Sequence, residues 1–91
     1  MSEPIRRRVK VYGRVQSVFF RDSTEREASG RGLAGWVRNR DDGAVEAVFE
    51  GDPDDVRALV DFCESGPGAA DVERVETTEE EPEGLSGFEV R

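Results

Sequence analysis

The sequence predicts an α+β fold, a two-layer sandwich in which two helices cover one face of a largely antiparallel sheet. Segments with the alternation of strands and segments with helical spacing follow one another in the order β-α-β-β-α-β, and a short strand closes the chain. A hairpin signal, Asp41-Asp42-Gly43, joins the second and third strands. In the split βαβ arrangement the first crossover leaves a gap that a later strand fills, so the first strand becomes central. With 91 residues, we expect a single domain over residues 1–91.

The first half of the chain is predicted to form a strand, a helix and a second strand. After a lead-in over residues 1–5, residues 8–12 alternate polar and apolar side chains, as a half-buried strand does, and Gly13 ends that strand. Residues 22–31 are predicted to form a helix with acidic residues toward its start, and residues 33–39 a strand. The charged triplet Arg6-Arg7-Arg8 is interpreted as a solvated strand entry.

The second half adds a strand, a helix and two more strands. Residues 45–50 alternate cleanly, which predicts the third strand. Asp52 followed by Pro53 marks a helix start, because Asp is a good N-cap acceptor and Pro fits the first helical position. Gly66-Pro67-Gly68 ends that helix. Residues 72–78 are predicted to form the fourth strand, residues 79–84 an acidic loop, and residues 88–90 a short closing strand.

The net charge of −8 is unevenly placed along the chain. Residues 1–40 hold ten Lys/Arg against four Asp/Glu, whereas residues 41–91 hold three against seventeen. This acidic half argues against general nucleic-acid binding, which needs a broad positive face, and it fits a solvated surface or an adaptation to concentrated salt.

Composition also narrows the chemistry and the location. The chain has no histidine and one cysteine, Cys63, so neither the commonest general base nor a multi-cysteine metal site is available. No secretory signal or transmembrane run is evident. We therefore expect a cytoplasmic monomer that has no membrane and no nucleic acid as partner.

The segment between the first strand and the first helix is the candidate site. A strand, a tight turn and a helix N-terminus together form a cradle for an anion, because the first helical N–H groups have no intrahelical acceptor. Arg21 stands at its far end, and a guanidinium can grip two phosphate oxygens at once. An arginine at a helix start is disfavoured by the helix dipole, which points to a functional reason for it.

Two motifs carry a resemblance to a known family. Gly13-Arg14-Val15-Gln16-Ser17-Val18-Phe19-Phe20-Arg21 is followed by Gly35-Trp36-Val37-Arg38-Asn39. Together they closely resemble the G-x-V-Q-G-V-x-F-R and G-W-V-x-N signatures of the acylphosphatases, and the resemblance covers nearly the whole chain. It implies the ferredoxin-like fold and the hydrolysis of acyl phosphates to a carboxylate and inorganic phosphate, with no metal or other cofactor.

The same resemblance implies the roles of individual residues. Arg21 corresponds to the phosphate-binding arginine and Asn39 to the asparagine that orients the attacking water. Ser17 replaces the usual second glycine of the turn, and if that position needs a positive φ, serine costs about 1 kcal/mol. The proposed phosphate cradle is the backbone of Arg14, Val15, Gln16, Ser17, Val18, Phe19 and Phe20. Their proximity to Asn39 rests on the resemblance alone.

Two other classes of function are open at this stage. A non-catalytic module that binds phosphate would use the same cradle without turnover, since this fold serves many purposes. An RNA-binding domain of similar topology would need exposed aromatic side chains on the sheet, and Tyr12 and Trp36 are the candidates. The acidic half of the chain opposes the second alternative.

Overall fold

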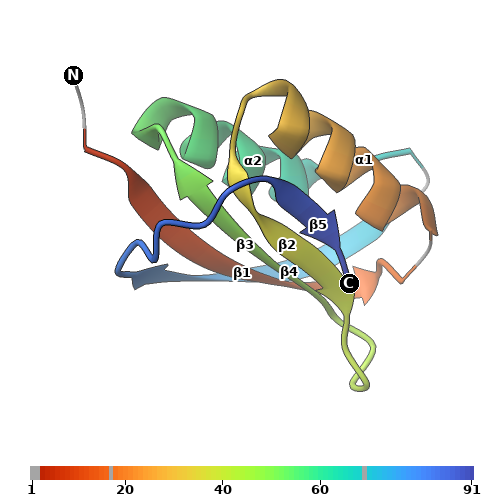
Figure 1. The fold of residues 1–91 in the computed structure, drawn as a ribbon. Coiled ribbons are helices and arrows are strands. Elements are labelled where there is room, and N and C mark those ends of the chain that lie inside the picture. The colour runs from red at the N-terminus through yellow and green to blue at the C-terminus, as the bar shows by residue number, and fades with distance from the viewer. Residues whose placement is uncertain (1–2, 17, 69) are drawn as a thin grey trace.

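A computed structural model describes residues 3–16, 18–68 and 70–91, and within these ranges the chain forms two helices and five strands (Figure 1). Their bounds are β1 Ile5–Arg14, α1 Val18–Gly30, β2 Ala34–Asn39, β3 Val45–Gly51, α2 Pro53–Ser65, β4 Asp71–Glu80 and β5 Phe88–Val90. The helices lie side by side on one face of the sheet, as Figure 1 shows.

The strand order in the sheet is β4-β1-β3-β2-β5. β1 pairs with both β3 and β4, so the first strand is central, as predicted. These ladders and the β2–β3 ladder are antiparallel, and β5 adds to β2 in parallel. The arrangement confirms the predicted α+β, ferredoxin-like architecture.

Apolar side chains from both helices and from one face of the sheet form the core. α2 has the clearest apolar stripe, with Val56, Leu59 and Cys63 buried at helical spacing. The sheet contributes mainly β-branched and aromatic residues, which pack well on a pleated surface. The buried apolar side chains of β1 and β3 on this face are Val9, Val11, Val45, Ala47 and Phe49.

The ends of α2 form as the local sequence predicts. The carboxylate of Asp52 accepts a hydrogen bond of 3.0 Å from the backbone N–H of Asp54, and Pro53 occupies the first helical position. At the other end Gly66 has a φ of 73°, and its N–H donates to the carbonyl of Phe62. Both signals involve neighbours in the sequence, which explains why they could be predicted.

Three elements are longer than predicted. β1 begins at Ile5 and continues through Gly13, with a register shift between Tyr12 and Gly13 in its ladder with β4. α1 begins at Val18, so its first turn contains no acidic residue. β4 extends to Glu80 and takes two residues from the predicted acidic loop. The β1–β4 extension has a physical cause, because charges of opposite sign face each other across these two strands.

The face of the sheet away from the helices is ionic, and the charged residues at its centre are buried. Arg6, predicted to be solvated, is 3% exposed and forms ion pairs with Glu50, Glu80 and Glu83. Glu46 and Glu50 in β3 are also buried, although alternation alone suggests that they face solvent. This strand is central, and long side chains from its neighbours cover the carboxylates.

Trp36 lies on the same face. Its indole is 7% exposed, and the guanidinium carbons of Arg8, Arg38 and Arg91 stand 5.4, 5.4 and 4.9 Å from the ring centroid. The cations hold the ring by cation–π attraction and cover it. The RNA-binding alternative therefore has no open Trp36 surface on which a base could stack.

Candidate active site

The topology brings the two predicted site segments to one edge of the sheet. Val45 of β3 pairs with Val11 on one side and with Asn39 on the other. Because β1 and β2 both run antiparallel to β3, their carboxyl ends lie at the same edge, about 10 Å apart at two strand spacings. Figure 1 shows the β2–β3 hairpin leaving the sheet at the end where β1 stops and α1 begins.

A backbone irregularity introduces the turn after β1. The register shift at Gly13 is a bulge-like feature, and such features redirect the chain beside active sites. Gly13 has a φ of 129°, and a Cβ at this position would collide with the carbonyl oxygen of Asp71. Only glycine fits both the dihedral angle and the space.

Two core side chains hold the turn in place. Val15 is 1% exposed and Phe20 is fully buried, so both ends of the turn are packed into the core. Phe19, which lies between them in the sequence, is 74% exposed. Val15 and Phe20 therefore anchor the turn in the core on either side.

The start of α1 provides an anion-binding end. In any α-helix the first N–H groups lack an intrahelical acceptor, which here concerns Val18 and Phe19, and the N-terminus carries partial positive charge. The first turn contains no carboxylate to neutralise it. Arg21 follows in this same turn and adds a full positive charge.

Arg21 and Asn39 share an unusual property. Among the residues that the structure describes, the buried side-chain nitrogen and oxygen atoms without a hydrogen-bond partner are Nε of Arg21 and Oδ1 of Asn39. Buried polar atoms are nearly always paired, because an unpaired one costs about 1–3 kcal/mol. Unpaired donors and acceptors at the predicted site residues are what a site built for a polar ligand would carry.

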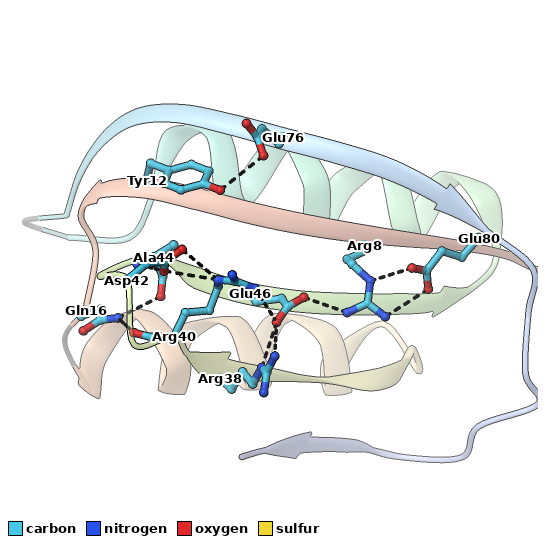
Figure 2. Close-up of polar contacts among 10 residues, drawn as sticks. All are labelled: Arg8, Tyr12, Gln16, Arg38, Arg40, Asp42, Ala44, Glu46, Glu76 and Glu80. Atoms are coloured by element: carbon cyan, nitrogen blue, oxygen red, sulfur yellow. Dashed lines mark hydrogen bonds and ion pairs between the residues drawn. The ribbon is translucent and has the colours of Figure 1, made fainter.

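Gln16 joins the turn after β1 to the β2–β3 hairpin (Figure 2). Its side-chain Nε2 donates to the backbone carbonyl of Arg40 and, at 2.9 Å, to that of Ala44. Arg40 directly follows Asn39, so a single carboxamide connects the predicted phosphate cradle to the strand end that bears the second site residue.

Glu46 braces the hairpin from the ionic face of the sheet. Its carboxylate accepts hydrogen bonds from Arg38 at 2.8 Å, from Arg8 at 2.8 Å and from Arg40 at 3.4 Å (Figure 2). Burial raises the pKa of Glu46, but the hydrogen bonds from Arg38 and Arg8 outweigh it and hold this pKa below its ordinary value. Glu46 therefore stays charged and fixes both arginines that flank Asn39.

The hairpin borders an open hollow of about 280 Å³, which residues 38–42 line. The carboxylate of Asp42 accepts from the backbone N–H of Ala44 at 3.1 Å and from Nε of Arg40 at 3.2 Å. These bonds lower the pKa of Asp42, chiefly through the Ala44 N–H. The loop is thus held by its own side chains as well as by Gln16.

The described residues include no group of three or more His, Cys, Asp or Glu side chains placed to hold a metal ion. Cys63 is buried, and burial raises the pKa of its thiol to about 12. No helix in the described ranges has the length and apolarity to span a membrane.

The structure places most of the predicted site residues at one edge of the sheet. Arg21 is in the first turn of α1, Asn39 is the last residue of β2, and Arg14 is exposed at the end of β1. Ser17 lies outside the described residues, so the expected effect of serine in place of glycine stays a prediction. Sequence reasoning missed Glu46, because nothing local indicates that a glutamate in an alternating strand will bind three arginines.

Comparison with known proteins gives one consistent result. The sequence profile named Acylphosphatase matches residues 7–90. The chain is 56% identical over 86 residues to an acylphosphatase of Thermococcus kodakarensis and 55% identical over 86 residues to one of Haloarcula marismortui, and each alignment covers 94% of both chains. The solved structure of an acylphosphatase from Coxiella burnetii superposes with a TM-score of 0.91 at 39% identity and covers 97% of this chain and 93% of that one. An acylphosphatase from Bacillus subtilis superposes with a TM-score of 0.90, also at 39% identity, and covers 96% of this chain and 98% of that one. On this sequence and structural evidence, the chain belongs to the acylphosphatase family.

Proposed function

We propose that this chain hydrolyses the carboxyl–phosphate bond of an acyl phosphate, giving a carboxylate and inorganic phosphate, and that it does so where α1 begins. The alternative of a non-catalytic phosphate-binding module is not favoured by the family assignment. The observation that carries the proposal is the pair of unpartnered polar atoms, on Arg21 and Asn39, at one edge of the sheet.

The phosphoryl group binds at the turn after β1. Backbone N–H groups of the segment 14–20, above all those of Val18 and Phe19 at the open end of the helix, donate to its oxygens. The guanidinium of Arg21 adds a charge-assisted pair of hydrogen bonds. Phosphoryl transfer mainly requires positioning and stabilisation of charge on the equatorial oxygens, and these two groups supply both.

Asn39 orients the attacking water. Its carboxamide has both a donor and an acceptor, so it can hold a water in line with the bond that breaks. An amide is too weak a base to take the proton, and we assign that role to the phosphate of the substrate. The leaving carboxylate is a weak base that departs without protonation, so the absence of histidine is no obstacle to this chemistry.

We further propose that the enzyme works in the cytoplasm as a monomer on a small acyl phosphate, with no nucleic-acid partner. The net charge of −8 supports the last point, because a phosphate backbone would be repelled. Sedimentation equilibrium across a hundredfold range of concentration tests the monomer, and a stable dimer would contradict it.

The test of the site is hydrolysis of benzoyl phosphate by the purified protein. Arg21→Ala should lower kcat/KM by about 10³-fold or more, the range measured for arginines that stabilise phosphoryl transfer. Arg26→Ala is the matched control, because Arg26 is an exposed arginine on the same helix. Equal loss in both variants would remove Arg21 from the site.

Protection by inorganic phosphate separates the two functions. If phosphate raises the unfolding temperature of the protein but no acyl phosphate is hydrolysed at any salt concentration, the non-catalytic alternative is correct. Turnover that survives Arg21→Ala would locate the reaction elsewhere.

A further inference from the structure

We propose that Gln16 is a positioning residue that sets the distance between the phosphate cradle and Asn39. The inference rests on the proposed function and assigns Gln16 a role of its own in it. It is drawn from the two hydrogen bonds that Gln16 donates to the β2–β3 hairpin, at Arg40 and Ala44.

The two bonds connect the two halves of the site. Gln16 lies two residues before α1, whereas its acceptors lie 24 and 28 residues further along the chain. One acceptor belongs to the residue after Asn39, and the other closes the hairpin. Figure 2 shows the carboxamide of Gln16 reaching into the mouth of this hairpin.

The hairpin that receives these bonds is also held by hydrogen bonds of its own. The N–H of Arg40 donates to the carbonyl of Ala44 at 2.8 Å, and Asp42 bonds to both residues. Glu46 fixes the arginines on each side of Asn39. A displacement of Arg40 would therefore displace Asn39 as well. By fixing the carbonyl of Arg40, Gln16 also fixes the position of the carboxamide that orients water.

The chemistry of the side chain explains why glutamine suits this position. Two carbonyl oxygens need two donors, and the NH₂ group of a carboxamide has two. Glutamate has the same shape but would set a carboxylate against two carbonyl oxygens. Alanine would leave the turn attached to the hairpin only through the core and the sheet.

The expected consequence is a loss of turnover without a loss of phosphate binding. A displacement of about 1 Å at a reacting group can cost about 10²-fold in rate. Val15 and Phe20 anchor the cradle in the core on either side of Gln16, so we expect phosphate binding not to depend on the Gln16 side chain. Gln16→Ala should therefore lower kcat by about 10-fold to 10²-fold and leave the inhibition constant of inorganic phosphate within about 2-fold.

A double-mutant cycle tests the mechanism. Benzoyl phosphate hydrolysis and phosphate inhibition are measured for Gln16→Ala, Asn39→Ala and the double variant, with Ser29→Ala as control. Ser29 also donates one side-chain hydrogen bond, 2.9 Å to Glu25, but at the far end of α1. If Gln16 acts through Asn39, its substitution should change kcat by less than about 2-fold once Asn39 is absent.

Each outcome decides the question. Multiplying effects in the double variant, or a phosphate inhibition constant that rises as much as kcat falls, would overturn the proposal. Gln16→Glu keeps the side-chain shape, so full activity in this variant would do the same, because it lacks the donors. If Asn39→Ala alone retains kcat, the role of Asn39 in the proposed function is wrong, and the role of Gln16 falls with it.

Discussion

Asn39→Ala should separate activity from stability, because the side chain carries a buried atom without a partner. Leaving Oδ1 of Asn39 unsatisfied costs the folded state about 1–3 kcal/mol. Alanine removes that cost together with the few packing contacts of a half-buried side chain at a strand end. The free energy of unfolding should therefore stay the same or rise by about 1 kcal/mol, which corresponds to about 4–8 °C in Tm for a domain of this size.

The activity should move in the opposite direction. Without the carboxamide, the attacking water loses its orientation, and kcat should fall about 10²-fold, or about 2.7 kcal/mol of transition-state stabilisation. The assay is benzoyl phosphate hydrolysis, with urea unfolding of the same preparations. Thr24→Ala is the contrasting control, because its buried hydroxyl does have a partner, the carbonyl of Phe20 at 2.7 Å, and its loss should destabilise by about 1 kcal/mol.

One result would refute this reasoning. If Asn39→Ala is destabilised by 1 kcal/mol or more and hydrolyses its substrate at the normal rate, the side chain serves the fold. The unpartnered oxygen would then be a feature of a strand end with no part in catalysis.

Three further predictions follow from the same contacts. Burial raises the pKa of Glu50, but hydrogen bonds from the backbone N–H groups at residues 83–85 and from the guanidinium of Arg6 outweigh it and hold this pKa below the unfolded value of about 4.3. The stability that Glu50 contributes is therefore present above that pH and is lost as the pH falls. Urea midpoints measured between pH 7 and 3 should decline less steeply in Glu50→Gln than in the unmodified protein. Leu59→Ala should lower the free energy of unfolding by about 2–5 kcal/mol in urea titrations, because Leu59 is fully buried, whereas a loss below 1 kcal/mol would mean that the core collapses around it. Gly13→Ala should lose both stability and phosphate affinity, measured by thermal unfolding with and without phosphate, since its Cβ meets the carbonyl of Asp71; normal phosphate protection would show that the bulge does not shape the site.

The path of the first helix illustrates where local patterns stop being informative. Charged residues from Asp22 onward suggested a start at that point, but α1 begins at Val18. β-branched and aromatic residues are poor helix formers, so Val18, Phe19 and Phe20 gave no helical signal. Burial of Phe20 in the core outweighs the low helix propensity of these three residues, so the helix begins four residues earlier than predicted.

The site residues divide in the same way. Arg21 and Asn39 could be named from two motifs, and their roles stay predictions until variants are measured. Gln16 could be noticed in the motif, but its acceptors could not be named, because they are backbone carbonyls on a distant hairpin. No sequence signal connects a side chain to a carbonyl that every residue possesses.

The sequence by itself determined the order of the elements, the caps of α2, the core stripe of that helix and the family. Each of these depends on spacing between near neighbours or on a contiguous motif, and such information is written along the chain. Only the tertiary structure decided that Arg6 and Glu50 are buried together and that Arg6 pairs with Glu80, 74 residues away. The physical reason is that alternation assigns a side chain to a face of the sheet, whereas its exposure depends on which strands and charges the fold brings alongside it.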